Sequence, residues 1–252
     1  MSRGRPLRTI DLARAAKTHV NTVRVYERLG FIAPTGRSPN GYRVFTPDHQ
    51  RQMCLARLAL DGPWTGRKIR RSALHLARVA AAGNWKRTVA RAAAHLAVVR
   101  GEHACAERAA EAVGHWAQRK RSDRAKKPMT ILLAATEIGV TPDAIRNWER
   151  NGLLRSSRNA TNRYRLFDSQ ALGRLRVIAM LRDAGYSLMA ILRMLRAYDR
   201  GELVDARRTL DTPRVSEDLV YATDVWLTTL GRAEEQARRV LAFCRRAQQA
   251  SW

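Results

Sequence analysis

Arginine, asparagine and tyrosine side chains recur along this chain at a constant offset of 122 residues. Arg24 has its counterpart in Arg146, and the run Asn-x-Tyr-Arg at 40–43 returns at 162–165. Arginine donates paired hydrogen bonds to phosphates and guanine edges, and asparagine pairs similarly with adenine. No nucleophile–base pair, paired-carboxylate site or phosphate-binding glycine loop stands out beside them. The chemistry expected of these residues is binding rather than catalysis, and we expect no enzyme.

The recurring residues belong to a longer internal repeat. Residues 9–69 align without a gap on residues 131–191, with eleven identical positions and like-for-like exchanges at several others. A fixed-offset repeat defines the architecture before any single residue does. Two similar units on one chain can bind two similar sites on one partner.

The charge indicates what that partner is. The formal net charge is +25 over 252 residues, divided as +17 (25 basic, 8 acidic) over residues 1–125 and +8 (22 basic, 14 acidic) over residues 126–252. Phosphate backbones attract such a surface through counterion release. A solvated arginine-rich surface and an anionic membrane are the alternatives, and no basic amphipathic anchor or lipidation motif supports the membrane. We therefore expect a nucleic acid.

The remaining composition excludes several classes of protein. Cys54, Cys105 and Cys244 are too scattered for a disulfide framework or a zinc site, so small buried thiols are expected. His103 and Cys105 form one close pair, but positions i and i+2 do not share a helical face. We expect neither metal nor cofactor. Without a signal peptide or a membrane-length apolar stretch, we expect a cytoplasmic, nucleoid-associated protein.

Each repeat predicts a helix, a turn, a helix, a hairpin and a pair of helices. In the first unit helices are predicted over 9–17 and 20–29, with Gly30 ending the second. In the second unit the turn, cap, first helical residue and terminator are predicted at Gly139, Thr141, Pro142 and Gly152.

The hairpins and later helices follow the same logic. Asn40-Gly41 predicts a two-residue hairpin turn, whereas Asn162-Arg163 fits that geometry less well. A longer helix follows each hairpin, and a short helix follows Trp64 and Tyr186. Amphipathic helices are predicted over 72–82, 86–121 and 214–249. The basic stretch 119–128 (RKRSDRAKKP) is predicted to form the boundary between the two halves.

An ordered set of short motifs occurs once in each unit. The first set is Leu12-Ala13, Thr22-Val23-Arg24-Val25-Tyr26-Glu27-Arg28, Gly30-Phe31-Ile32 and Asn40-Gly41-Tyr42-Arg43-Val44-Phe45. The second is Ala134-Ala135, Ala144-Ile145-Arg146-Asn147-Trp148-Glu149-Arg150, Gly152-Leu153-Leu154, Asn162-Arg163-Tyr164-Arg165-Leu166-Phe167 and Gly185-Tyr186-Ser187-Leu188. Each set resembles the winged-helix DNA-binding domain of mercury-resistance-type (MerR) regulators, over about half of the chain. The family has tyrosine where Val25 and Asn147 stand, so base preference is expected to differ between the units.

This resemblance implies a mainly α fold with two winged helix-turn-helix domains, each followed by a helical segment. Because family members dimerise through a long helix, two copies in one chain imply an intramolecular pseudo-dimer built by pairing of helices 86–121 and 214–249. The expected domains are a first winged helix (1–70), a helical connector (71–125), a second winged helix (126–195) and a C-terminal helical segment (196–252).

The candidate DNA-binding residues lie on the second helix and the wing of each unit. Early recognition-helix residues face base edges, whereas wing residues contact phosphates. Glu27 and Glu149 are expected to pair with arginines instead. Surface ion pairs remain an alternative for Arg24 and Arg146, partial burial for the wing tyrosines, and core packing for Tyr26 and Trp148. The candidates are Asn21, Thr22, Arg24, Val25, Tyr26, Arg37, Tyr42 and Arg43, then Asp143, Ala144, Arg146, Asn147, Trp148, Arg163, Tyr164 and Arg165.

Three functions compete. The first is a transcriptional regulator that binds an imperfect inverted repeat in double-stranded DNA, bends or untwists the promoter and so assists RNA polymerase, as a single chain or a further homodimer. The second is an architectural or excisionase-like DNA-bending protein. The third is a ligand-sensing regulator with a pocket near Trp85, Trp116 and Trp226, residues for which core packing is the alternative.

Overall fold

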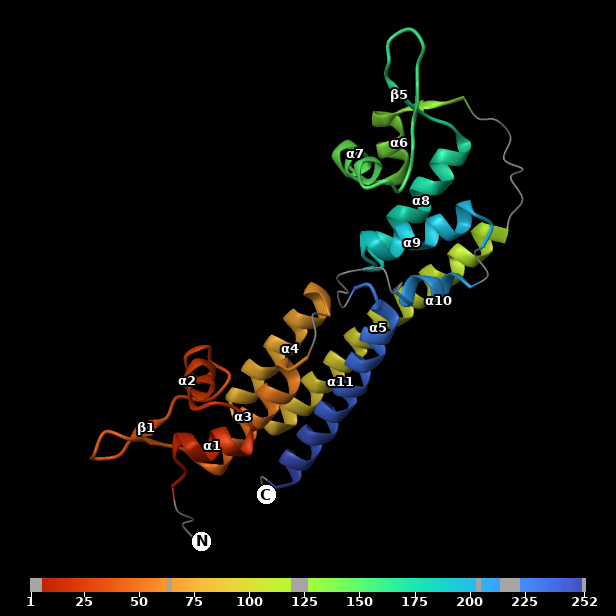
Figure 1. Cartoon of the computed structure of the whole chain (residues 1–252). Helices are drawn as coiled ribbons and strands as arrows, with labels where there is room; N and C mark the ends of the chain where they lie inside the picture. The colour runs from red at the N-terminus through yellow and green to blue at the C-terminus, as the bar shows by residue number, and fades with distance from the viewer. Residues whose placement is uncertain (1–5, 63–64, 119–126, 203–204, 214–222, 251–252) are drawn as a thin grey trace. The chain divides into compact units, whose positions relative to one another are not determined.

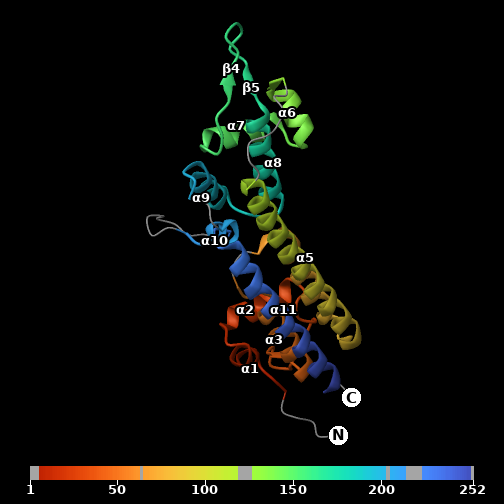
Figure 2. The same cartoon turned by 90° about the vertical axis from the view of Figure 1, so that its right-hand side faces the viewer.

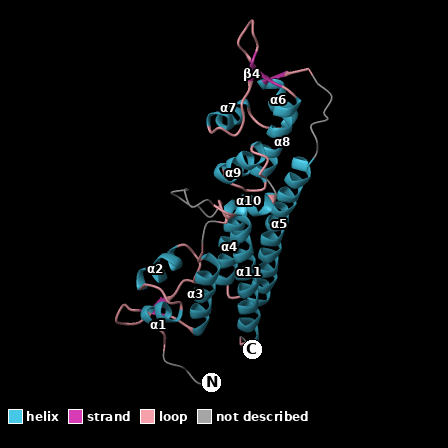
Figure 3. Cartoon of the chain, turned by 45° about the vertical axis from the view of Figure 1, so that its right-hand side comes forward, coloured by secondary structure: helices cyan, strands magenta, loops and turns pink. Residues whose placement is uncertain are grey.

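A computed structural model of the chain describes residues 6–62, 65–118, 127–202, 205–213 and 223–250 (Figure 1). The chain forms two compact units. Unit 1 contains residues Met1–Gly101 and Leu230–Trp252, and unit 2 contains residues Glu102–Thr229. The chain is mainly helical. Its short strands form a two-stranded sheet in unit 1 and a three-stranded sheet in unit 2, coloured magenta in Figure 3.

Unit 1 begins with the predicted helix-turn-helix. Lys17 has a left-handed backbone (φ 49°) in the turn, and the His19 ring accepts a hydrogen bond from the backbone N–H of Asn21 at 3.2 Å. Gly30 (φ 72°) ends the second helix as predicted. The elements are α1 (Thr9–Ala15), α2 (Val20–Arg28), β1 (Gly36–Arg37), β2 (Arg43–Val44), α3 (Pro47–Leu60), α4 (Gly66–Ala81) and the beginning of α5 (Trp85–Gln118).

One prediction about unit 1 is wrong in its division of the chain. A short helix after Trp64 and a separate helix over 72–82 were expected, but α4 is a single helix from Gly66 to Ala81. The segment contains no proline, and buried residues such as Ile69, Leu76 and Ala80 follow one another at helical spacing. Trp64 itself lies outside the described residues.

Groups of buried side chains hold unit 1 together, and two of them connect segments distant in sequence. Leu12, Val23 and Phe45 join the helix-turn-helix to the hairpin and α3. The second group includes Trp85 from α5 together with Val240 from α11 (Trp226–Gln249), so helices far apart in sequence share one core. Within unit 1, the expected pairing of the two long helices is therefore confirmed.

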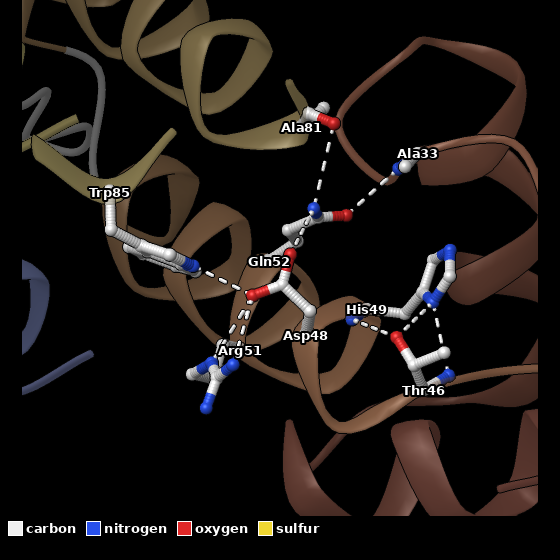
Figure 4. Close-up of polar contacts among 8 residues, drawn as sticks. All are labelled: Ala33, Thr46, Asp48, His49, Arg51, Gln52, Ala81 and Trp85. Atoms are coloured by element: carbon white, nitrogen blue, oxygen red, sulfur yellow. Dashed lines mark hydrogen bonds and ion pairs between the residues drawn. The ribbon is translucent and has the colours of Figure 1, made fainter. Parts of the chain in front are cut away.

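A partly buried polar network fixes the beginning of α3 against α5. The Asp48 carboxylate accepts a hydrogen bond from the Trp85 indole at 2.7 Å and another from the Gln52 amide at 3.1 Å (Figure 4). Gln52, which is 2% exposed, also accepts from the backbone of Ala33 at 2.9 Å. Because a buried polar group without a partner is costly, this satisfied network defines one arrangement of these helices.

Unit 2 repeats the helix-turn-helix with the predicted signals. Gly139 has φ 77°, Thr141 accepts from the Ala144 N–H at 3.1 Å, Pro142 is the first helical residue, and Gly152 has φ 75°. In Figure 2 the hairpin β4–β5 extends away from α6 and α7. The elements are β3 (Met129–Thr130), α6 (Ile131–Ile138), α7 (Pro142–Arg150), β4 (Ser157–Arg158), β5 (Arg165–Phe167), α8 (Ser169–Asp183), α9 (Leu188–Asp199) and α10 (Ala206–Asp211).

A different set of contacts supports the helices of unit 2. Arg193 on α9 is 5% exposed and donates to the backbone carbonyls of Thr209 (2.7 Å), Leu210 (3.0 Å) and Asp224 (3.0 Å). These bonds attach α10 and the residues before α11 to α9. The buried Tyr186 hydroxyl donates to the carbonyl of Ala106 at 3.0 Å, which ties the end of α8 to α5.

The two units are not the four segments expected from the sequence. Their boundaries fall within α5 and α11, at residues 101–102 and 229–230. The four-segment division stays a prediction, and most of the expected linker 119–128 lies outside the described residues. So do residues 214–222 of the expected helix 214–249. Residues 223–225 form a turn instead, and the helix begins at Trp226.

Gly185 allows a close approach that a larger residue would block. It has φ +97°, and a Cβ there would lie 2.7 Å from Nε1 of Trp226. We expect Gly185→Ala to lose about 1–3 kcal/mol through overpacking, in addition to about 1–2 kcal/mol of backbone strain. The control Gly152→Ala has φ +75° with open space around it, so it carries the strain alone. Urea unfolding followed by circular dichroism compares them, and equal losses would contradict the role of Trp226.

His95 makes unit 1 sensitive to acid. It is 4% exposed, and its Nδ1 has no hydrogen-bond partner among the described residues. Burial, and then the charge of Arg91, lowers the pKa of His95 from 6.5 to about 4. The folded state favours the neutral ring of His95. The fold therefore has its full stability above pH 6.5 and loses stability as the pH falls toward 4. Urea unfolding of His95→Leu should vary less with pH across this window than that of the wild type, and identical profiles would contradict the assignment.

Candidate nucleic-acid interface

The recognition helices α2 and α7 bury one face and expose the other. Val23 and Ile145 are fully buried at equivalent positions. One residue further on, Arg24 and Arg146 are exposed. Because the buried residue fixes the rotation of each helix, its early polar residues are presented to solvent as a recognition helix requires.

The wing of unit 1 closes differently from the prediction. Arg37 pairs with Arg43 across β1 and β2, and the N–H of Ser38 donates to the carbonyl of Tyr42 at 2.8 Å. The loop therefore contains the three residues 39–41, not two. Gly41 occupies its last position with φ 79°, which is the usual place for glycine in a three-residue loop.

The wing of unit 2 has a loop one residue longer. Arg158 pairs with Arg165, and Asn159 donates to the carbonyl of Tyr164 at 2.9 Å, which leaves the four residues 160–163 in the loop. Arg163 takes the left-handed position with φ 60°. The two hairpins therefore differ in register by one residue, although their sequences align without a gap.

This shift brings in an arginine that the sequence comparison missed. Arg37 donates to the carbonyl of Gly41 at 3.1 Å, and Arg158 donates to the carbonyl of Arg163 at 3.3 Å. Arg158 is therefore the structural counterpart of Arg37, although the repeat aligns Asn159 with it. The alternation of side chains along the strand could have indicated this residue only if the register had been known.

An ion pair connects recognition helix and wing in both units. Arg43 Nε donates to a Glu27 carboxylate oxygen at 2.7 Å, and Arg165 Nε donates to Glu149 at 2.6 Å. Burial acts to raise the pKa of Glu149, but hydrogen bonds from Ser156 and Arg165 outweigh it and lower the pKa. The expectation that Glu27 and Glu149 pair with arginines is met.

Between α2 and the wing of unit 1 lies an open hollow of about 630 Å³. It brings together four of the predicted residues and adds Arg28, which was not proposed. The signal for Arg28 was its position one helical turn after Arg24. The residues lining the hollow are Asn21, Arg24, Val25, Glu27, Arg28 and Arg43.

The aromatic candidates divide into two groups. Tyr42 and Tyr164 at the wings are 71% and 67% exposed, so partial burial does not account for them. Trp148 is 6% exposed, which favours core packing over a contact with sugar or phosphate. Tyr26 is half-buried and packs edge-on against Phe31 with ring centroids 5.4 Å apart.

The remaining candidates are distributed along α2, α7 and the wings. Thr22 and Ala144 are half-buried early in their helices, and Asn147 is exposed. Arg146 forms an ion pair with Asp143 at 2.5 Å, so its surface ion-pair alternative is realised. Within the described part of the chain, no carboxylate pairs with Arg24.

The tryptophans proposed for a ligand pocket are engaged in packing. Trp85 and Trp226 are 4% and 3% exposed, and the Trp226 indole donates to the carbonyl of Ala184 at 2.9 Å. Trp116 stacks on Tyr198 with centroids 4.4 Å apart. These contacts favour core packing.

The cysteines are free among the described residues, and burial raises the pKa of Cys244 to about 12. No group of three or more His, Cys, Asp or Glu side chains in the described ranges is placed to hold a metal ion. None of the helices that the structure describes has the length and apolar character needed to cross a bilayer.

Comparison with known proteins agrees with this geometry. Residues 8–45 match the MerR family regulatory protein model, and residues 129–198 match that of the MerR HTH family regulatory protein. The chain is 37% identical over 73 residues to the HTH-type transcriptional regulator MerD of Acinetobacter calcoaceticus; the match covers 29% of this chain and 60% of that protein, less than two thirds of its length. No solved structure shows a significant match. Two MerR-type domains thus occur in succession, and the chain is a tandem-domain member of the MerR family.

Proposed function

We propose that this protein is a transcriptional regulator that binds double-stranded DNA sequence-specifically through both winged helices. The observation that carries this proposal is the repeated surface formed by an exposed recognition helix and a wing joined by a Glu–Arg ion pair. In unit 1 this surface encloses the arginine-lined hollow. The similarity to MerD, an HTH-type transcriptional regulator, agrees with it.

Each part of the surface has a distinct task. The major groove of B-DNA is about 12 Å wide and admits one helix, so α2 and α7 enter it with Asn21 and Asp143 near the base edges. The exposed Tyr42 and Tyr164 donate to phosphates beside the groove. Phosphate contacts fix the register of the protein, and the helix residues read the sequence.

Two such surfaces on one chain bind two half-sites of an imperfect inverted repeat. The proposed pseudo-dimer spaces the half-sites by about one helical turn or a multiple of it. Engaging both bends or untwists the DNA between them, at a cost of about 1–6 kcal/mol that the many phosphate contacts offset. RNA polymerase is the partner that such a distorted promoter serves. The protein then works in the cytoplasm on the nucleoid, alone or as a further homodimer.

The net charge of +25 favours one rival, an architectural protein that bends DNA without reading it. Selection of bound sequences from random DNA, with the mass of the complex measured, separates the two. A mirrored consensus bound by one chain supports the regulator. A steeply salt-dependent binder without a consensus supports the architectural protein.

Arg24 is exposed on α2 and lines the hollow beside the wing, so its removal tests the interface directly. Arg24→Ala should weaken binding to the selected duplex about tenfold. It should also lower the steepness of log affinity against log salt concentration by about one, as for one lost phosphate contact. The matched control is Arg239→Ala, which removes an exposed arginine from α11. Fluorescence anisotropy across salt concentrations measures both. Unchanged binding by the folded double variant Arg24→Ala/Arg146→Ala would overturn the proposal.

The Glu27–Arg43 pair gives a test in which charge and structure predict opposite outcomes. Glu27→Gln removes a negative charge from the DNA-facing hollow, and charge alone would raise the affinity. If the pair positions the wing, affinity instead falls by about fivefold, or about 1 kcal/mol. Glu235→Gln on α11 is the control for net charge. A rise in affinity for Glu27→Gln in the same binding assay would contradict a positioning role.

A further inference from the structure

The two recognition surfaces share a framework but differ at one end of the helix. The Glu–Arg pairs at 2.7 and 2.6 Å are alike in both units. Arg24 and Arg146 also occupy equivalent positions, 122 residues apart. Three residues before Arg24 and Arg146 the units diverge, because unit 1 has Asn21 and unit 2 has Asp143.

Asp143 lies at the exposed beginning of α7. Its side chain is 87% exposed, and its carboxylate receives a hydrogen bond from Arg146 at 2.5 Å. Pro142 and Thr141 fix the backbone immediately before it, so the side chain of Asp143 starts from a well-defined backbone position. Asn21 begins α2 in the same way, but it carries no charge.

A carboxylate and a carboxamide read different base edges. The carboxylate only accepts hydrogen bonds, and in the major groove cytosine presents a donor, its N4 amino group, without a neighbouring acceptor. Adenine presents both N6–H and N7, which suits the donor and acceptor of an asparagine. A carboxylate facing the wrong base, or facing phosphate, is repelled, and such repulsion creates specificity.

We propose that Asp143 is a specificity-determining residue that makes the half-site of unit 2 require cytosine, while Asn21 makes the half-site of unit 1 prefer adenine at the equivalent position. The inference rests on the proposed function and deepens it. Arg146, held by Asp143, binds beside the same base step, whereas Arg24 has no such partner in the described part of the chain. The two half-sites are therefore unequal in sequence, and the chain has one orientation on its DNA.

Asn147 adds to the difference. Its carboxamide oxygen accepts a hydrogen bond from the Asn151 side chain at 2.9 Å, so its amino group remains as the donor. The equivalent positions in unit 1 are Val25 and Leu29, which have no polar side-chain groups. At this position unit 2 therefore presents a polar group to the groove where unit 1 presents an apolar one.

The test exchanges the two residues. Asp143→Asn and Asn21→Asp are each assayed against a library of duplexes in which every position of both half-sites is varied. For Asp143→Asn we expect the preference for cytosine over adenine at one position of one half-site to fall by about tenfold or more. Asn21→Asp should produce the reverse change at the mirrored position of the other half-site. Glu202→Gln, which removes an exposed ion-paired carboxylate from unit 2 outside α7, should alter no preference.

Three outcomes decide between the possibilities. A change confined to one position of the expected half-site supports the assignment. If the wild type selects a sequence and the folded Asp143→Asn variant keeps every base preference, Asp143 only pairs with Arg146, and the inference is overturned while the proposed function stands. A wild-type chain without sequence preference overturns both.

Discussion

The connection between helix and wing is the constraint on which both binding surfaces depend. A two-stranded hairpin is marginally stable by itself. Here Glu27 holds Arg43 of one wing, and Glu149 holds Arg165 of the other. Each pair joins the recognition helix to the strand that follows the loop. Each pair is thus a direct link between the wing tyrosines, which we propose bind phosphates, and the helix residues that we propose read bases.

Local signals explain why the helix-turn-helix was predictable. A glycine at positive φ, a threonine cap and a proline at the first helical position act within a few residues, and Gly139, Thr141 and Pro142 lie as predicted. The Glu–Arg pairs were also expected, because many arginines lie near each of these glutamates in the sequence.

The wings and supporting helices were less predictable, because longer-range packing determines them. Whether a loop closes with three or four residues depends on which strand residues pair, so a gapless repeat concealed the role of Arg158. Trp148 has an amphipathic side chain that suits either the core or the surface, and its burial depends on neighbours outside α7. The pairing of Asp143 with Arg146 is different, since its spacing of three residues was visible in the sequence.

The two winged helices pack against different supporting helices. In unit 1, α4 packs into a core that includes Trp85 and Val240. In unit 2, the buried Arg193 on α9 satisfies the carbonyls of Thr209 and Asp224. Both winged helices rest on apolar cores, and unit 2 adds a buried guanidinium that bonds backbone carbonyls. Duplicated sequences have kept the binding surface alike while the underlying support has diverged.

Unit 1 is discontinuous along the chain, and this affects its synthesis. Val240, Cys244 and Ala247 complete a core whose other members begin at Leu55. A ribosome that has made the first winged helix has not yet made those side chains, and α4 and α5 must wait with apolar surface uncovered. A stop codon shortly before residue 240 would thus leave the core that Leu55 and Leu76 share near the other end of the chain incomplete.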